Sequence, residues 1–184
     1  VYSMPPQAGS VKRANIMQDS NSFKKNLNLY VMGEDADGNL TEVSTTTKEN
    51  LKIWLQSKKM INDTIDILDA QIINVGIRFI ADTDLQDKDS VLIKCIEALK
   101  NKYQEKFDIG QSFSLSEVYK TLNLIPEITD CKSVKLFLQN DANYASTNFD
   151  INSNISADGS HVFCPERSVY EVKYGNIDII GTII

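Results

Sequence analysis

Residues 65–80, IDILDAQIINVGIRFI, decide the fold because β-branched side chains recur along almost their whole length. Such side chains fit the pleated, half-buried surface of a sheet, so the stretch predicts one long strand or two strands joined by a bend. Asp66 and Arg78 are expected on the wetter face. The β-branched positions are Ile65, Ile67, Ile72, Ile73, Val75, Ile77 and Ile80.

The residues before this stretch predict a linker and two strands. Residues 1–10 contain two prolines and a glycine and are expected to form a linker or lead-in segment. They lack the basic and apolar regions of a signal peptide, and we expect the chain to be cut from a longer one. A strand is expected at residues 11–17. Residues 26–32 alternate apolar and polar side chains with the period of two that marks a half-buried strand.

A helix is expected between these strands and the central stretch. Thr46 followed by Glu49 forms a capping-box signature. Apolar residues then recur at helical spacing, which predicts an amphipathic helix that ends near Lys59. The single tryptophan is expected to anchor this helix to the core. The apolar face carries Leu51, Trp54 and Leu55.

Two further helices and a strand are expected after the central stretch. A helix from about Lys88 has an apolar stripe and a charged stripe on opposite faces. Gly110 precedes a second capping box, Ser114 to Glu117, which opens a short helix. A strand at residues 132–138 follows. The apolar stripe of the first of these helices comprises Val91, Leu92, Cys95, Ile96, Leu99 and Tyr103.

Residues 141–184 differ in character from the rest of the sequence. They are rich in Asn, Ser, Asp and Gly, and six acidic residues stand against only Arg167 and Lys173. Turn residues between short apolar runs indicate a β-rich segment whose apolar end pairs with another strand. The β-like runs are residues 148–151, 161–164, 169–174 and 177–184.

Together these elements predict an α+β fold. Helices cover small sheets in the order β-β-α-β-α-α-β, and a β-rich C-terminal segment follows. The 184 residues suffice for one ordinary domain or two small ones. The expected organisation is a linker at residues 1–10, a first α+β module at 11–62, a β-α-α-β module at 63–140 and a β-rich C-terminal module at 141–184.

The composition is that of a globular, acidic protein. It has 42% hydrophobic and 24% charged residues and a net charge of -6. This charge opposes phosphate binding, so no nucleic-acid partner is expected. No apolar run approaches the roughly 20 residues of a membrane span, so no membrane partner is expected. The widely spaced Cys95, Cys131 and Cys164 fit neither a disulfide framework nor a zinc site and are expected to be reduced, structural thiols.

The residue types that usually carry catalysis or bind metals form no convincing group. The only histidine, His161, is expected at the surface, and in an extended segment its side chain points away from that of Cys164. Asp35 to Asn39 resembles the start of a calcium loop, but its glycine is misplaced, and a strand-to-helix turn explains it better. The acids between Asn62 and Asp69 are explained by a turn and an exposed strand face. No enzyme activity, cofactor or metal is expected.

Four short sequence motifs, taken in order, indicate a family. They are LKIWL at residues 51–55, KKMINDTIDI at 58–67, DAQIINVGI at 69–77 and GQSFS at 110–114. Their order and spacing resemble the baseplate J-like family, and most closely the baseplate wedge subunit of T4-like contractile-tailed phages. The pattern covers residues 27–138, and the tail from residue 148 resembles the family less distinctly.

The resemblance implies a structural role without catalytic residues. It implies a late portion of a wedge subunit that forms homodimers, binds other baseplate wedge proteins and helps to link wedges into a ring around the tail tube. The chain would then reside in the virion tail baseplate after assembly in the host cytoplasm. No small-molecule substrate is implied. The candidate interface residues are Ile177, Ile179, Ile180, Ile183, Phe163, Lys59 and Met60.

Two other functions remain open from the sequence. A glycan- or small-molecule-binding module would use the Asn- and Tyr-rich region that includes Tyr144, Asn148, Tyr170 and Tyr174. It requires a concave aromatic pocket. A hydrolase would need two carboxylates that converge in a cleft about 5 to 9 Å apart.

Overall fold

The computed structural model describes residues 1–19, 26–58, 64–103 and 107–184. Within these ranges the chain has the expected α+β class, with three α-helices and strands that form small sheets. The elements are β1 (Arg13–Gln18), β2 (Leu27–Glu34), β3 (Leu40–Thr41), α1 (Thr45–Gln56), β4 (Ile65–Asp69), β5 (Gln71–Asp82), α2 (Lys88–Lys102), β6 (Phe113–Ser114), α3 (Leu115–Asn123), β7 (Asp130–Leu138), β8 (His161–Val162), β9 (Ser168–Glu171) and β10 (Ile179–Ile183), with 3-10 turns at Pro6–Ala8 and Asn152–Asn154.

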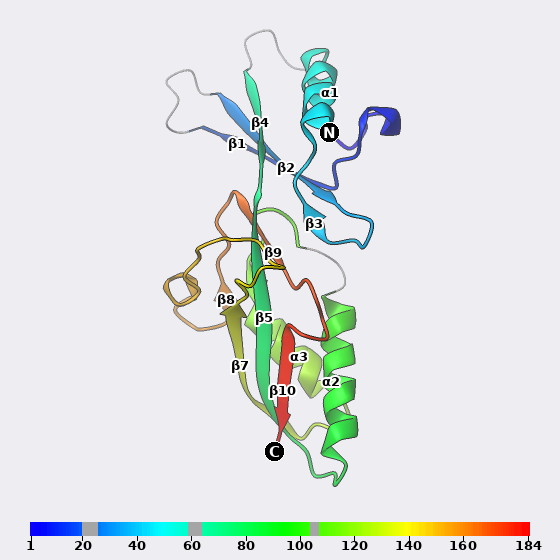
Figure 1. Ribbon diagram of the computed structural model, residues 1–184. Helices are drawn as coiled ribbons and strands as arrows, with labels where there is room; N and C mark the ends of the chain where they lie inside the picture. The colour runs from blue at the N-terminus through cyan, green and yellow to red at the C-terminus, as the bar shows by residue number, and fades with distance from the viewer. Residues whose placement is uncertain (20–25, 59–63, 104–106) are drawn as a thin grey trace.

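The decisive stretch forms two strands that belong to two different sheets. The break falls at the buried Ala70, whose N–H donates to the carbonyl of Val31 (3.1 Å). β4 pairs in parallel with β2 in the first sheet, whereas β5 is the central strand of the second. Figure 1 shows β4 and β5 running almost end to end, with β1 to β3 and α1 around the upper part and the second sheet below. The expected bend is therefore the connection between the two halves of the molecule.

The first sheet places β2 between β1, which is antiparallel, and the parallel β4. Helix α1 packs on this sheet through the fully buried Leu51, while Trp54 is only partly buried. The predicted cap at Thr46 is wrong. Ser44 caps the helix by accepting a hydrogen bond from Thr47 N (3.2 Å), and Thr46 lies within the first turn. Two hydroxyl residues so close together both satisfy the local capping pattern, and the chain uses the earlier one.

In the second sheet, β5 pairs with the antiparallel β7 and with β9 and β10, which are both parallel to it. Gln71 N donates to Arg167 O (2.9 Å) and Ile77 N donates to Asp178 O (2.7 Å). Because N–H groups alternate between the two edges of a strand, these two odd-numbered donors point to the same edge. β9 and β10 therefore act as one edge strand interrupted between residues 172 and 178. The run predicted at residues 148–151 forms no strand and leads into a 3-10 turn.

The main core lies between this sheet and the helices α2 and α3. The capping box predicted at Ser114 is confirmed, since its Oγ accepts from Glu117 N (3.2 Å), and Asp87 caps α2 in the same way. Odd-numbered residues of β5 face the helices, in keeping with the two-residue period of a strand. The central core residues are Ile73, Val75, Ile77, Phe79, Ala81, Val91, Cys95, Leu99, Val118 and Leu122.

The two halves of the molecule meet through a small buried cluster. It contains Met32 and Leu40 of the first sheet, Val169 of the second, and Ala70 and Ile109 from the segments between strands. Strand β9 takes part in this contact through Val169, and β9 and β10 complete the sheet around β5. In the described residues, no helix is long and apolar enough to cross a membrane.

Candidate interface

The outer edge of β10 is an unpaired sheet edge in the described part of the chain. The carbonyl of Asp178 accepts from β5, and Ile184 N donates to Ala81 O (3.0 Å). Since backbone groups alternate along a strand, Ile179, Gly181 and Ile183 direct their N–H and C=O groups to the outside. Such an edge is a template for pairing with another strand.

The opposite edge of the same sheet is partly covered. The N–H of Val134 in β7 donates to the hydroxyl of Tyr119 in α3 (2.9 Å). A side chain that occupies a backbone donor blunts the edge and hinders strand addition. The two edges of the sheet are therefore unequal, and β10 offers the more open one.

The predicted interface isoleucines fall into two groups. Ile177 and Ile180 expose 63% and 41% of their surface, whereas Ile179 is buried and Ile183 packs against the core. This division follows from the period of two, because β10 turns alternate side chains into the core. Ile179 and Ile183 are thus available to a partner only through their backbone groups.

The remaining predicted interface residues lie elsewhere. Phe163 follows the short strand β8 and exposes 54% of its surface. Lys59 and Met60 lie outside the described residues. Phe163 therefore belongs to the segment after β8 and not to β10.

The face of the second sheet opposite the helices is exposed along its lower half. Arg78 and Ile80 of β5 are exposed there, and Lys135 of β7 stands directly opposite Arg78 in the register. Ile180 of β10 is the neighbour of Arg78 on the other side. The guanidinium of Arg78 lies over the ring of Phe137, 5.2 Å from its centroid. The exposure of Arg78 was predicted from the sequence, whereas this patch was not, because only the register between the strands places its members together.

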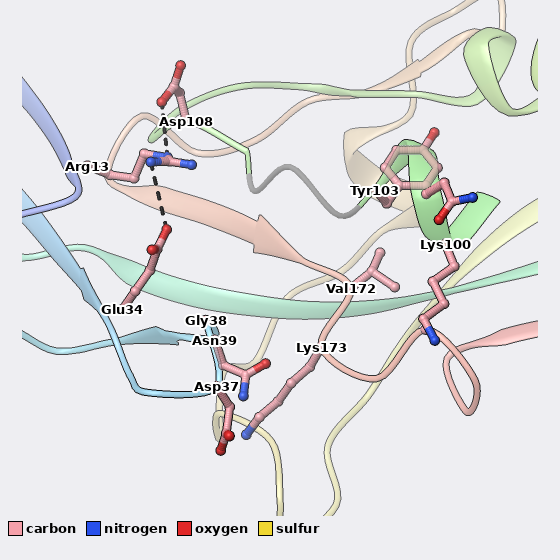
Figure 2. A pocket seen from close by; sticks show the side chains of 12 residues that line it. Arg13, Glu34, Asp37, Gly38, Asn39, Lys100, Tyr103, Asp108, Val172 and Lys173 are labelled. Carbon is pink, nitrogen blue, oxygen red and sulfur yellow. Dashed lines mark ion pairs between the residues drawn. The ribbon is translucent and has the colours of Figure 1, made fainter. Parts of the chain in front are cut away.

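A polar groove of about 870 Å³ runs between the two halves of the molecule. Figure 2 shows Arg13 between two carboxylates: Nη1 lies 3.9 Å from Glu34 Oε1, and Nε lies 3.3 Å from Asp108 Oδ1. The Arg13 guanidinium thus links these two acids. The three side chains form an ion-pair network, which differs from the acid and nucleophile pair of a hydrolase. The other residues that line the groove are Asp37, Gly38, Asn39, Lys100, Asn101, Tyr103, Val172, Lys173 and Gly175.

The tyrosines of the predicted ligand-binding region do not share one pocket. Tyr170 is fully buried, and its hydroxyl donates to Phe163 O (2.9 Å). Tyr144 and Tyr174 pack edge to face with ring centroids 5.6 Å apart, and the hydroxyl of Tyr144 donates to Asp178 Oδ1 (2.5 Å). Asn148 is exposed. The aromatic pocket that the glycan-binding hypothesis requires is not formed by these four residues.

The candidate calcium loop is a turn between two strands, β2 and β3, and not a strand-to-helix turn. Asp35 Oδ1 accepts from Asp37 N (2.9 Å) and from Asn39 N (2.8 Å), and Gly38 adopts a φ of 79°. These hydrogen bonds lower the pKa of the Asp35 carboxyl. The carboxylate therefore folds the turn, and in the described residues no group of three potential metal ligands converges anywhere.

His161 and Cys164 each have a partner of their own. Ser160 Oγ lies 2.6 Å from His161 Nδ1 and donates to Asp158, both of whose oxygens are 2.8 Å away. These contacts belong to an exposed turn, and hydrogen bonds from Ser156 and Ser160 lower the pKa of Asp158. Cys164 Sγ contacts Ser168 O at 3.3 Å. This arrangement provides no activated thiol next to the imidazole.

All three thiols are expected to react slowly in the folded protein. Burial raises the pKa of Cys95 and Cys131 to about 11 and that of Cys164 to about 12. Because the thiolate is the nucleophile, about one thiol in a thousand is reactive near pH 8 when its pKa is about 11. An aromatic disulfide reagent should release three equivalents of thiolate rapidly in guanidinium but only slowly in native buffer. Rapid reaction of the native protein would contradict this burial.

The fold is similar to that of a chain in the cryo-EM structure of the anti-feeding prophage baseplate, symmetrised sixfold. The match covers 92% of this chain and 34% of the other, with a TM-score of 0.54 and 10% sequence identity. This chain therefore spans 34% of the length of the chain it matches. No protein-family model matches the sequence, and no curated protein sequence matches it. At 10% identity the similarity shows the fold alone. It extends beyond residues 27–138, which contain the four sequence motifs.

Proposed function

We propose that this chain is a structural subunit of the baseplate wedge of a contractile tail. It self-associates and binds neighbouring baseplate proteins to build the ring around the tail tube. The observation that carries the proposal is that 92% of the chain matches the fold of a chain from a solved baseplate. The protein then acts through its surfaces and needs no cofactor, metal or small-molecule substrate. It belongs to the virion tail and is assembled in the host cytoplasm.

The outer edge of β10 is the surface that we assign to self-association. Two copies that pair their β10 strands antiparallel around a twofold axis would form one continuous sheet and a homodimer. The outward backbone groups of Ile179, Gly181 and Ile183 supply the hydrogen bonds. Such pairing would also bring the exposed side chains of Ile177 and Ile180 close to the other copy.

The unequal edges of the sheet support this assignment. Tyr119 occupies a donor on the β7 edge, so strand addition is favoured at β10. Pairing through the β10 edge alone adds one partner strand to the sheet. The result is a closed dimer and not an open sheet that grows at both ends.

Gene deletion with complementation tests the proposal. In the strain that encodes the chain, deletion is expected to abolish complete contractile particles, because a ring without its wedge subunit does not close. The wild-type gene should restore them. Ile183→Pro should fail to restore them, since proline removes one outward N–H from the β10 edge. The readout is the number of particles with a baseplate in negative-stain electron micrographs.

Ile183→Val is the matched control, because valine keeps the outward N–H and a β-branched side chain. It is expected to restore particles as the wild type does. Both variants should melt within a few degrees of the wild type, so that unfolding does not explain the loss. Normal baseplates in the deletion strain would refute the baseplate function. Normal baseplates with Ile183→Pro alone would refute the role of the β10 edge.

A further inference from the structure

Two cations of the open sheet face stand side by side without an acid. Arg78 and Lys135 are directly opposite each other on β5 and β7, and both are exposed. In the described ranges no carboxylate lies within 4 Å of either cation, and Arg78 is instead held over Phe137. Like charges directly opposite on a sheet face are destabilising. An approaching carboxylate would relieve this repulsion, whereas an apolar partner would not.

Exposed apolar side chains flank the two cations. Ile180 of β10 is next to Arg78, and Ile80 lies two residues farther along β5 on the same face, with 41% and 36% of their surfaces exposed. A face of this kind offers apolar contact at its flanks and positive charge at its centre. The surface that fits it is an apolar residue placed between carboxylates.

The chain carries such a surface on the outward side of α2. Asp89, Ile93 and Glu97 are spaced by four residues and therefore form one stripe along the helix. Ile93 exposes 58% of its surface, and in the described part of the chain no cation lies within 4 Å of either acid. The nearby lysines are engaged elsewhere, Lys94 with Glu127 and Lys100 with Asn176.

The two surfaces lie on opposite sides of the same sheet. Helix α2 packs on the core face through Val91, Cys95 and Leu99, whereas Arg78 and Lys135 are on the other face. One molecule cannot bring them together within itself. Two molecules can, and the pair then keeps one unused sheet face on one copy and one unused stripe on the other for further copies.

We propose that the open sheet face of one copy, formed by Arg78, Ile80, Lys135 and Ile180, binds the Asp89–Ile93–Glu97 stripe of a second copy. The contact is head to tail, so it generates a ring when the rotation between copies closes and a filament when it does not. It differs from the twofold pairing of β10 edges and is able to link such dimers. It goes beyond the proposed function and does not depend on it.

Charge reversal on each surface tests this contact. One variant carries Arg78→Glu and Lys135→Glu, and the other carries Asp89→Lys and Glu97→Lys. The average mass of each is measured by light scattering over a tenfold concentration range. Each variant alone is expected to associate at least about tenfold more weakly than the wild type, because both of its surfaces then have the same sign. An equimolar mixture should associate again, since each native surface finds its native complement.

The chain with all four substitutions provides the decisive control. Its two surfaces have exchanged signs, so its association should return to within about threefold of the wild-type value. Pairing of β10 edges contributes equally to every variant, because no substitution alters the outward backbone groups of β10. If charge reversal of Arg78 and Lys135 disturbs folding, the variant with Arg78→Gln and Lys135→Gln is used, because it removes both positive charges without adding negative ones.

Three results would overturn the proposal. The first is a wild-type mass that does not rise with concentration, which would point to an acidic surface of another protein as the occupant. The second is an unchanged mass for a folded, charge-reversed variant. The third is a folded chain with four substitutions that stays dissociated. None of these results bears on particle assembly in the deletion strain, so the failure of this contact and the failure of the baseplate function can be told apart.

Discussion

Asp178→Ala is expected to lower the free energy of unfolding by about 3 kcal/mol, because it orphans several donors around a buried carboxylate. Asp178 is fully buried just before β10. Its Oδ1 accepts from Gln139 Nε2 (3.0 Å) and from the hydroxyl of Tyr144 (2.5 Å). Its Oδ2 accepts from the backbone N–H of Tyr174 (2.7 Å). Chemical denaturation followed by circular dichroism measures the loss.

Asp141→Ala is the matched control for this variant. Asp141 lies in the same polar segment, but its side chain is exposed, and its backbone carbonyl alone accepts from Tyr144 N (2.9 Å). A change of no more than about 0.5 kcal/mol is expected for such a surface position. Asp178→Asn should fall between the two, since an amide retains one acceptor oxygen. Equal effects of Asp178→Ala and Asp141→Ala would show that the buried carboxylate does not hold this turn.

Loss of Asp178 is also expected to weaken self-association. The carboxylate fixes the turn that leads into β10, and the Asp178 carbonyl forms the first hydrogen bond to β5. A loosened turn would let the start of β10 fray and disorder its outer edge. The same buried group therefore links stability to the proposed interface.

Local patterns predicted most elements of the fold. The two-residue alternation around Leu29 and the dense β-branched stretch of β5 each placed a strand, and the Ser114 cap placed α3. These signals are local, since a side-chain period and a capping hydroxyl depend on neighbours in sequence. The break at Ala70 was the one local feature left undecided between a single strand and two.

The partners of the strands could not be predicted in the same way. β9 and β10 pair in parallel with β5, about one hundred residues earlier, across two helices and several loops. No local pattern of Ser168–Glu171 or Ile179–Ile183 specifies which strand it joins. A parallel pairing leaves no hairpin signature, because its connection is long.

The candidate interface shows the same limit. The isoleucines near the C-terminus were all plausible as exposed interface residues, yet the sheet buries Ile179 and leaves Ile180 exposed. The two-residue period of a strand predicts that the side chains of neighbouring residues point to opposite faces of the sheet. Only the packing of α2 shows which of these faces is the inner one. The pair of Arg78 and Lys135 depends on the register between β5 and β7, which the sequence does not reveal.

Two acidic residues of the C-terminal segment have a role that the sequence did not reveal. From the sequence its six carboxylates could only be counted, whereas the structure shows that Glu171 and Asp178 are buried. Glu171 is the last residue of β9, Asp178 immediately precedes β10, and each accepts hydrogen bonds from distant segments. A buried acid surrounded by donors has no local signature, because its partners come from elsewhere in the chain.

Glu171→Ala is expected to have the largest effect of any single substitution considered for this chain, about 4 kcal/mol. Glu171 Oε1 accepts from Leu40 N (2.7 Å), and Oε2 accepts from Asn74 Nδ2 (2.9 Å). All three residues are buried, so water cannot replace the carboxylate. The hydrogen bond to Leu40 joins β3 of the first sheet to the second. We therefore expect the unfolding curve to split as well, with the first sheet melting at lower denaturant concentration.

Two further variants make this expectation specific. Glu166→Ala removes an exposed carboxylate from the preceding loop and should change stability by no more than about 0.5 kcal/mol. Glu171→Gln keeps an acceptor for Leu40 but brings its amide NH₂ against that of Asn74. Asn74 cannot turn round freely, because its Oδ1 accepts from Ala145 N (2.8 Å). Glu171→Gln should therefore restore the coupling of the two sheets but not the full stability. If Glu171→Ala instead unfolds in a single transition at the wild-type denaturant concentration, the two sheets are held together without this carboxylate.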